Sequence, residues 1–189
     1  MASDRRALIA DATIVTIARA GMRGLTHRAV DRAAALPEGS TSYYFRTREA
    51  LLFAALARMA ELDIADIGEL PDVGGLADLD ELTALLAVVM RRWLTTGRER
   101  TLARYELSLE STRRPELRAR MTEFGRGFRA MAETMLAAAG AGEPRRRGQA
   151  LVAYVDGLLF HQVAGVGADR LSDAELEAAC RDMLATALR

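Results

Sequence analysis

Hydroxyl groups are concentrated in one short stretch of the sequence, from Ser40 to Tyr44. A short helix made of Ser, Thr, Ser, Tyr and Tyr exposes hydrogen-bonding groups with little apolar area. Such a surface suits contact with base edges and phosphates better than packing in a core. Basic residues at neighbouring helix starts can hold a phosphate together with backbone amides. The residues expected to contact DNA are Thr26, His27, Arg28, Gly39, Ser40, Thr41, Ser42, Tyr43, Tyr44, Arg46 and Arg48.

The charge distribution agrees with a polyanionic partner for the N-terminal part. The 189 residues carry 26 basic and 26 acidic groups, so the net charge is zero. Residues 1–60 hold nine Arg and five acidic residues, a net charge of +4, which leaves −4 for residues 61–189. This asymmetry is a modest signal for DNA binding by the basic part. All basic residues are Arg, which reflects either genomic composition or phosphate binding by guanidinium groups.

The elements that must position these residues are helices. Apolar residues recur every three or four positions, and no run alternates with a period of two, so we predict an all-α fold of about nine helices. A first helix is predicted from about Asp4 to Ala20, ending at Gly21. Thr26 is predicted to cap a short second helix that ends before Pro37, and the hydroxyl-rich segment to form a third.

Longer helices are predicted for the rest of the chain. A fourth spans about residues 47–67, and the Gly- and Pro-containing run 68–75 is predicted to be the main linker. A fifth begins after Asp78, which can form a capping pair with Glu81. Later helix starts are marked by Pro115, by Pro144, and by Ser172 with Glu175.

The first three helices describe a helix-turn-helix, whose second helix enters the major groove. Residues 25–52 resemble the DNA-binding signature of TetR/AcrR-type transcriptional regulators. They combine a capping Thr, an Ala-rich second helix, a Gly before the hydroxyl-rich recognition helix, an aromatic pair followed by Phe, and a basic residue before Glu and Leu. The resemblance covers the whole chain in outline and about 50 N-terminal residues in detail.

Two positions depart from the pattern of that family. Ala35 stands where the turn commonly has Gly, which implies a turn that avoids a left-handed φ or tolerates Ala in one. Asp31 stands where a small Ala usually packs. Its candidate partners are Arg28, Arg32 and a residue of the first helix.

The resemblance implies a function and a division of the chain. Residues 1–48 would form the helix-turn-helix DNA-binding domain, and residues 49–189 a helical domain for ligand binding and dimerisation. We expect a cytoplasmic, ligand-responsive repressor that binds a palindromic operator as a homodimer. A small, largely apolar effector would release it by favouring a dimer in which the fourth helix has swung. An effector-independent activator or architectural DNA-binding protein is the main alternative.

The segment 150–166 is apolar nearly all round and is predicted to be buried on all sides. At 100° per residue it carries two apolar arcs about 140° apart, one facing the core and the other a partner subunit. One arc holds Tyr154, Leu158 and His161, and is assigned to the interior. The residues assigned to the dimer interface are Val152, Leu159, Val163, Val166, Leu176, Cys180, Met183 and Ala187.

An effector pocket is predicted among the aromatic residues of the middle helices, where large rings with sparse polar groups are typical of ligand sites. Ordinary core packing is the competing interpretation for each of them. Arg104 and Glu106 can also belong to a structural ion-pair network with Glu110 and with Arg113 or Arg114. The predicted pocket residues are Trp93, Arg104, Tyr105, Phe124, Phe128, Tyr154, Leu158 and His161.

No catalytic, metal or cofactor site is predicted. His161 and Asp156 are five residues apart and do not share a helix face, and Cys180 lies on an apolar stripe. No Gly-rich phosphate loop and no run long enough to span a membrane occurs. A helical enzyme acting on an apolar substrate is therefore the least favoured alternative.

Overall fold

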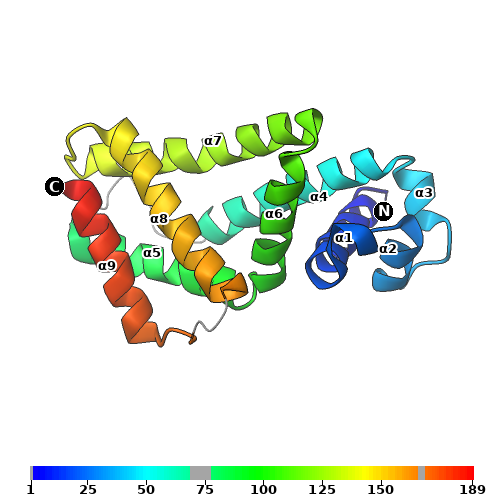
Figure 1. The fold of residues 1–189 in the computed structure, drawn as a ribbon, viewed down its shortest axis with the longest axis horizontal. Coiled ribbons are helices and arrows are strands. Elements are labelled where there is room, and N and C mark those ends of the chain that lie inside the picture. The colour runs from blue at the N-terminus through cyan, green and yellow to red at the C-terminus, as the bar shows by residue number, and fades with distance from the viewer. Residues whose placement is uncertain (1, 69–77, 166–168) are drawn as a thin grey trace. The chain divides into compact units, whose positions relative to one another are not determined.

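The computed structural model describes residues 2–68, 78–165 and 169–189, and in these ranges the chain forms nine helices and no strand (Figure 1). The all-α prediction is confirmed. The predicted linker at 68–75 lies almost entirely outside the described residues, which end at Gly68 and resume at Asp78. The helices are α1 (Ala2–Gly24), α2 (His27–Ala33), α3 (Ser40–Tyr44), α4 (Arg48–Gly68), α5 (Leu79–Leu94), α6 (Arg98–Ser111), α7 (Pro115–Ala138), α8 (Pro144–Ala164) and α9 (Asp173–Leu188).

The chain packs into two compact units. The first combines Met1–Ile64 with Glu99–Thr122, so that α1–α3, most of α4 and nearly all of α6 share one core. The second combines Ala65–Arg98 with Glu123–Arg189 and holds α5, α8, α9 and most of α7. The functional boundary after Arg48 is a different kind of division, and it stays a prediction.

Helix ends in the first unit follow the local signals in the sequence. α1 loses helical geometry at Gly21, whose φ of 62° lies in the left-handed region that favours Gly. The side chain of Thr26 accepts a hydrogen bond from the Ala29 N–H and caps α2. Ala35 adopts a φ of 53°, so the turn tolerates Ala in a left-handed conformation. A residue with a Cβ is strained there by about 1–2 kcal/mol.

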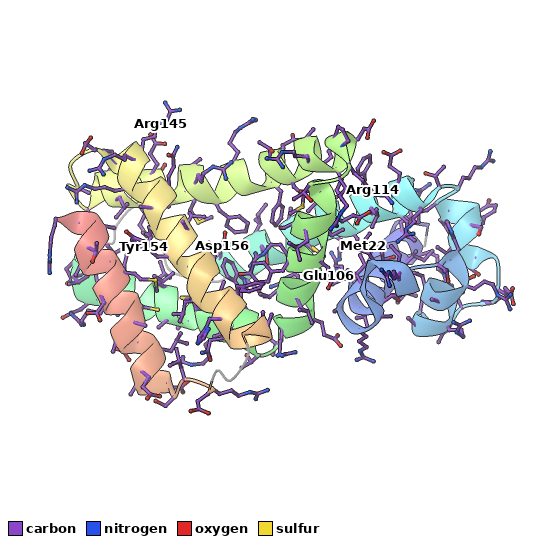
Figure 2. The ribbon with its side chains drawn as sticks, viewed as in Figure 1. Met22, Glu106, Arg114, Arg145, Tyr154 and Asp156 are labelled. Atoms are coloured by element: carbon purple, nitrogen blue, oxygen red, sulfur yellow. The ribbon has the colours of Figure 1, made fainter. Side chains whose placement is uncertain are left out.

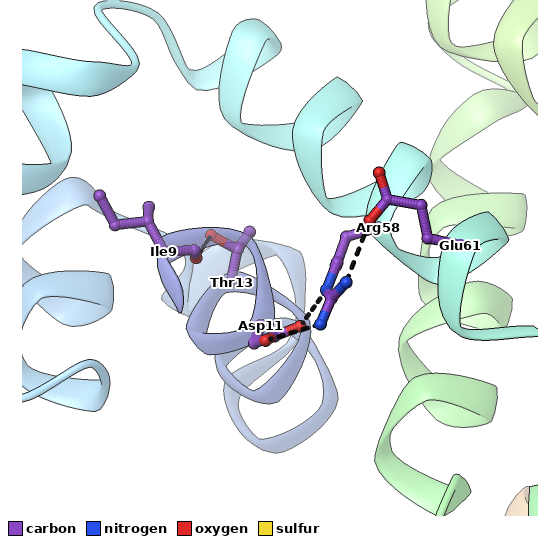
Figure 3. A network of polar contacts seen from close by, with 5 residues as sticks. All are labelled: Ile9, Asp11, Thr13, Arg58 and Glu61. Atoms are coloured by element: carbon purple, nitrogen blue, oxygen red, sulfur yellow. Dashed lines mark hydrogen bonds and ion pairs between the residues drawn. The ribbon is translucent and has the colours of Figure 1, made fainter. Parts of the chain in front are cut away.

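Ion pairs join the helices of the first unit. Arg58 of α4 donates to Asp11 of α1 over 2.8 Å and also contacts Glu61 (Figure 3). Burial would lower the pKa of Arg58, but the hydrogen bond to Asp11, the largest influence, and the one to Glu61 raise it. Further along α1, Arg19 contacts Glu99 of α6 at 2.6 Å. The first helix is thus paired with both α4 and α6 inside one unit.

The second unit is built on an antiparallel pair, α5 and α9. Arg181 lies 2.5 Å from Asp80 at the start of α5, and Arg91 lies 2.7 Å from Asp173 at the start of α9. The predicted capping box is confirmed, because Ser172 and Glu175 exchange side-chain and backbone hydrogen bonds. α8 packs against both helices and completes the core.

The structure contradicts the dimer-interface assignment for two of its residues, and for the others the assignment stays a prediction. Leu159 and Cys180 are fully buried within their own unit, so no partner subunit can reach them. The two arcs of α8 are both apolar, and helical periodicity gives their angular separation without telling which one faces the core. Val152 and Met183 are half-buried, and Val166 lies outside the described residues. The remaining members of the set, all buried, are Val163, Leu176 and Ala187.

Candidate nucleic-acid interface

The start of α3 is held by a carboxylate from α2. The N-cap residue Gly39 has a left-handed φ of 93° and offers no side chain, so the first amides of α3 need another acceptor. Asp31 supplies it. Its Oδ2 accepts from the Gly39 N–H at 2.8 Å, and its Oδ1 accepts from the Thr41 N–H at 2.7 Å and from the Thr41 hydroxyl at 2.5 Å. We call these three bonds the Asp31 clasp.

The Asp31 clasp keeps the carboxylate ionised although it is only 2% exposed. Burial is the largest single influence and would raise the pKa of Asp31. The hydrogen bonds from Thr41 and Gly39, together with the nearby His27, outweigh burial and lower the pKa below its ordinary value. None of the partners expected from the sequence, Arg28, Arg32 or a residue of α1, takes part in these bonds.

The clasp divides α3 into an inner and an outer face. Thr41 is fully buried and its hydroxyl is donated to Asp31, so the expectation that Thr41 contacts DNA is wrong. Ser42 and Tyr43 are exposed, and Tyr43 is 80% exposed. Ser40 is half-buried and donates its hydroxyl to the Pro37 carbonyl at 2.7 Å. Hydroxyl-bearing residues of α3 thus lie on both its buried and its exposed face, because successive residues of a helix are rotated by about 100°.

The end of α3 is tied to α1 and α2. Nε2 of His27 lies 2.7 Å from the Phe45 carbonyl oxygen, which can only accept, so this nitrogen carries the proton. Arg6 of α1 lies over the rings of Tyr44 and Phe45, with its guanidinium carbon 5.7 and 5.3 Å from their centroids. Sequence reasoning missed Arg6, because a ring contact across 38 residues leaves no local signal.

Other predicted phosphate ligands have contacts inside the protein. Arg48 donates to the Met22 carbonyl at the end of α1, so that part of its guanidinium caps a helix terminus. Arg28 pairs with Glu38 at 2.8 Å, with both side chains about two-thirds exposed. Arg46 is exposed. The side chains of the predicted set that lie open on this surface are therefore Thr26, Arg28, Ser42, Tyr43 and Arg46, together with the backbone of Gly39.

Three of the predicted effector ligands form a ring cluster in the second unit. Phe128 meets Trp93 edge to face with ring centroids 5.6 Å apart, and meets Phe124 in the same way at 5.2 Å. The indole is buried and the two Phe rings are half-buried. The rings from α5 and α7 thus form one edge-to-face cluster, in which the two Phe rings remain partly accessible.

The other predicted effector ligands lie elsewhere. Tyr154, labelled in Figure 2, is 48% exposed on α8, and His161 is also exposed, so these two do not line the interior of the unit. Leu158 is half-buried. Arg104 and Tyr105 belong to the first unit, where the Arg104 guanidinium lies over the Tyr105 ring and pairs with Asp63 at 3.6 Å.

The expected ion-pair network on α6 is partly correct. Arg114 contacts Glu110 at 2.5 Å, and Arg113 contacts it at 3.9 Å. Arg104 instead joins a buried group with Asp63 and Arg100, which lie on α4 and α6 of the same unit. Asp63 lies about 40 residues from Arg104 in the sequence, so the spacing of charges along one helix could not identify it as a partner.

Among the described residues, no cluster of His, Cys, Asp and Glu could hold a metal ion. Likewise, none of the described helices combines the length and hydropathy that crossing a membrane requires.

Comparisons with known proteins point to one family. Residues 77–188 match the family model described as the Tetracyclin repressor-like, C-terminal domain. A member of the TetR family from Streptomyces coelicolor A3 shares 31% identity with a TM-score of 0.74, over 98% of this chain and 99% of that one. The multidrug binding protein EbrR, solved in complex with ethidium, shares 32% identity with a TM-score of 0.71, over 98% and 99% of the two chains. No curated protein is significantly similar to this chain.

Proposed function

This chain belongs to the TetR family of transcriptional regulators, and from that premise we propose that it is a repressor that binds a palindromic operator as a homodimer. α3 serves as the recognition helix in the major groove, and each subunit presents one such helix to one half-site. A small, largely apolar effector lowers the affinity of the dimer for the operator.

The outer face of α3 carries the proposal. Tyr43 is 80% exposed, with Ser42 beside it and Arg46 shortly beyond the helix. The hydroxyls can donate to or accept from base edges, and the guanidinium can bind a phosphate. The Tyr43 ring meets the Tyr44 ring edge to face at 5.1 Å, and most of its surface stays open to a partner. The net charge of +4 over residues 1–60 supports the same interpretation.

Operator binding is tested with labelled duplexes from the DNA that flanks the protein's own coding region. Fluorescence anisotropy is recorded between low and physiological salt, with and without excess unrelated duplex. We expect the complex with the operator to persist in excess unrelated duplex. The logarithm of its binding constant is expected to fall linearly with the logarithm of the salt concentration. Transcription from the bound promoter is expected to fall when the protein is added. A chain that retards no duplex at low salt would refute the proposal.

Dimerisation is proposed to use the outward face of α8. This face carries Tyr154 and Phe160, which are 48% and 46% exposed, with the small residues Ala153 and Gly157 between them. Exposed aromatic side chains on one helix face are typical of a surface that another subunit covers. Sedimentation equilibrium is expected to show a dimer, which Phe160→Arg converts to monomer. The same change at an exposed position of α7, Thr134→Arg, should leave the dimer intact.

The effector is proposed to be a planar, largely apolar molecule that stacks on the ring cluster of Trp93, Phe124 and Phe128. The related EbrR binds ethidium, proflavin and malachite green. Because Trp93 is the only Trp in the chain, its fluorescence reports on that cluster directly. We expect proflavin and malachite green to quench the protein's Trp emission in a saturable manner in the absence of DNA. Phe128→Ala is expected to weaken this binding by about tenfold.

An effector-independent activator or architectural protein is the second candidate, favoured by the close edge-to-face packing of the same rings. The two functions differ in one measurement. A ligand that saturates the Trp93 signal must also change operator affinity if the protein is ligand-responsive, because coupling between two sites is reciprocal. Operator affinity that stays constant across the saturating range would favour the second candidate.

A further inference from the structure

We propose that Asp31 is a positioning residue for DNA recognition, which sets the rotation and tilt of α3 without touching DNA itself. The inference rests on the proposed function, because it concerns how α3 meets the operator. It assigns a role to the one acidic residue that departs from the family's usual pattern in this helix pair.

α3 requires an external partner in order to form. It has only five residues, far fewer than the roughly 12–15 that an isolated helix needs to be marginally stable in water. Its N-cap is Gly39, which has no side chain to accept a hydrogen bond from the first turn. The Asp31 clasp satisfies two amides of that turn, those of Gly39 and Thr41, from a residue near the end of α2.

The clasp also fixes how α3 is rotated about its own axis. Both oxygens of one carboxylate are used, so α3 cannot turn without breaking at least one of the bonds to Gly39 and Thr41. The third bond, to the Thr41 hydroxyl, holds that side chain against α2. With Thr41 inward, the next two residues, Ser42 and Tyr43, must face outward. The orientation of the proposed reading face is thus set by Asp31.

The sign of the charge argues for the same role. A carboxylate in a DNA-binding head opposes the negative potential of the phosphates, so removing an acid is expected to raise the affinity for every duplex. Asp31 of α2 is 2% exposed and accepts hydrogen bonds from α3, whereas Glu38, in the turn between these helices, is about two-thirds exposed. Loss of the negative charge is therefore expected to lower operator affinity at Asp31 and to raise it at Glu38.

The experiment compares Asp31→Asn with Glu38→Gln in the full-length protein. Each substitution removes one negative charge from the helix-turn-helix, and only the first breaks the clasp, because the amide group of Asn would point an N–H at an N–H of α3. We expect Asp31→Asn to lower operator affinity by about tenfold or more while changing affinity for unrelated duplex by less than about threefold. Glu38→Gln is expected to raise both affinities slightly.

A second pair of variants keeps the test valid if Asp31→Asn folds poorly. Thr41→Ser retains the hydroxyl that donates to Asp31, whereas Thr41→Val removes it and keeps a similar volume. Thr41→Val is expected to lower operator affinity about fivefold, because it loses a hydrogen bond to a charged group. Thr41→Ser keeps that bond and is expected to bind the operator about as tightly as the wild type. Hydrogen exchange of the backbone amide at position 41 is expected to be faster than in the wild type only in Thr41→Val.

Two outcomes would overturn the inference and leave the proposed function standing. One is an Asp31→Asn protein that binds the operator as tightly as the wild type. The other is a parallel rise in affinity for Asp31→Asn and Glu38→Gln, which would show that Asp31 affects DNA binding only through its charge. Failure of the wild-type protein to distinguish any operator from unrelated DNA would instead refute the proposed function.

Discussion

Nε of Arg100 on α6 lies 2.8 Å from Oδ1 of Asp63 on α4, and both side chains are nearly excluded from water. Arg104, one turn further along α6, contacts the other oxygen of Asp63 at 3.6 Å. A single buried carboxylate thus joins two guanidinium groups and fixes the register of α4 against α6 within the first unit. Breaking a buried pair is far more harmful than replacing it whole, because the remaining charges lose their compensation.

Asp63→Asn is therefore expected to destabilise the protein by about 3–5 kcal/mol, the usual range when one partner of a buried pair is removed. The measurement is the free energy of unfolding from urea titration. Glu99→Gln serves as the control, because the Arg19–Glu99 pair is exposed and contributes at most about 1 kcal/mol. Equal effects of the two substitutions would show that burial of Asp63 is not what makes its pair matter.

Substitutions on the outer face of α3 are expected to separate base reading from phosphate binding. Tyr43→Ala should alter the preference among operator variants, with about 1–3 kcal/mol lost at the affected base pair. Arg46→Ala should weaken binding to all duplexes and reduce the salt slope by about one. Binding to a panel of single-base operator variants at several salt concentrations distinguishes the two. A Tyr43→Ala protein with uniformly weaker binding would remove Tyr43 from the reading face.

The fold was predictable from local signals, since each depends on residues close together in the sequence. The caps at Thr26 and Ser172 and the break at Gly21 are recognisable because their partners lie within four residues. The site was predictable only in part. The role of Asp31 requires knowing that α3 turns back onto α2, and Thr41 and Tyr43 differ in burial only because of that contact.

The arginine-only composition gained a third explanation from the structure. Guanidinium groups donate to carbonyl oxygens at the ends of helices from which they are remote in sequence. Arg48 reaches Met22 of α1, Arg98 reaches Val163 of α8, and Arg147 reaches Ala187 of α9. Guanidinium groups suit this role because they carry several fixed donors and a charge that opposes the helix dipole. Such contacts span from 26 to 65 residues and leave no periodic pattern in the sequence.

Acid is expected to release the Asp31 clasp. The pKa of Asp31 is lowered in the folded protein, so the clasp contributes stability that is present above the ordinary aspartate pKa of about 3.9 and is lost as pH falls through the lowered value. The difference in unfolding free energy between wild type and Asp31→Asn should be constant near neutrality and shrink below about pH 4. A constant difference down to strong acid would contradict the assignment.

The thiol of Cys180 is expected to be inert in the folded protein. Burial, with a smaller contribution from Glu177, raises its pKa to about 11, and Arg91 only partly opposes the shift. The stability gained from keeping the thiol neutral is therefore present at neutral pH and is lost as pH rises through that value. A disulfide reagent at pH 8 should label Cys180 slowly in buffer and rapidly in urea. Rapid labelling of the native protein would show that α9 opens locally.

Gly148 of α8 allows a close approach to α7, whereas Gly127 of α7 faces open space. Substitution by Ala should therefore lower the free energy of unfolding at Gly148 and raise it at Gly127. A Cβ on Gly148 would lie 2.9 Å from the backbone nitrogen of Glu133, closer than real Cβ contacts. Gly148→Ala is expected to destabilise the protein by about 1–3 kcal/mol, because neither helix backbone can easily move. Gly127 of α7 has nothing within 4 Å of the corresponding position, so Gly127→Ala should stabilise by about 0.5–1 kcal/mol through helix propensity. Urea unfolding of both variants measures the two signs, and a stabilising Gly148→Ala would mean that α8 and α7 lie farther apart than the structure has them.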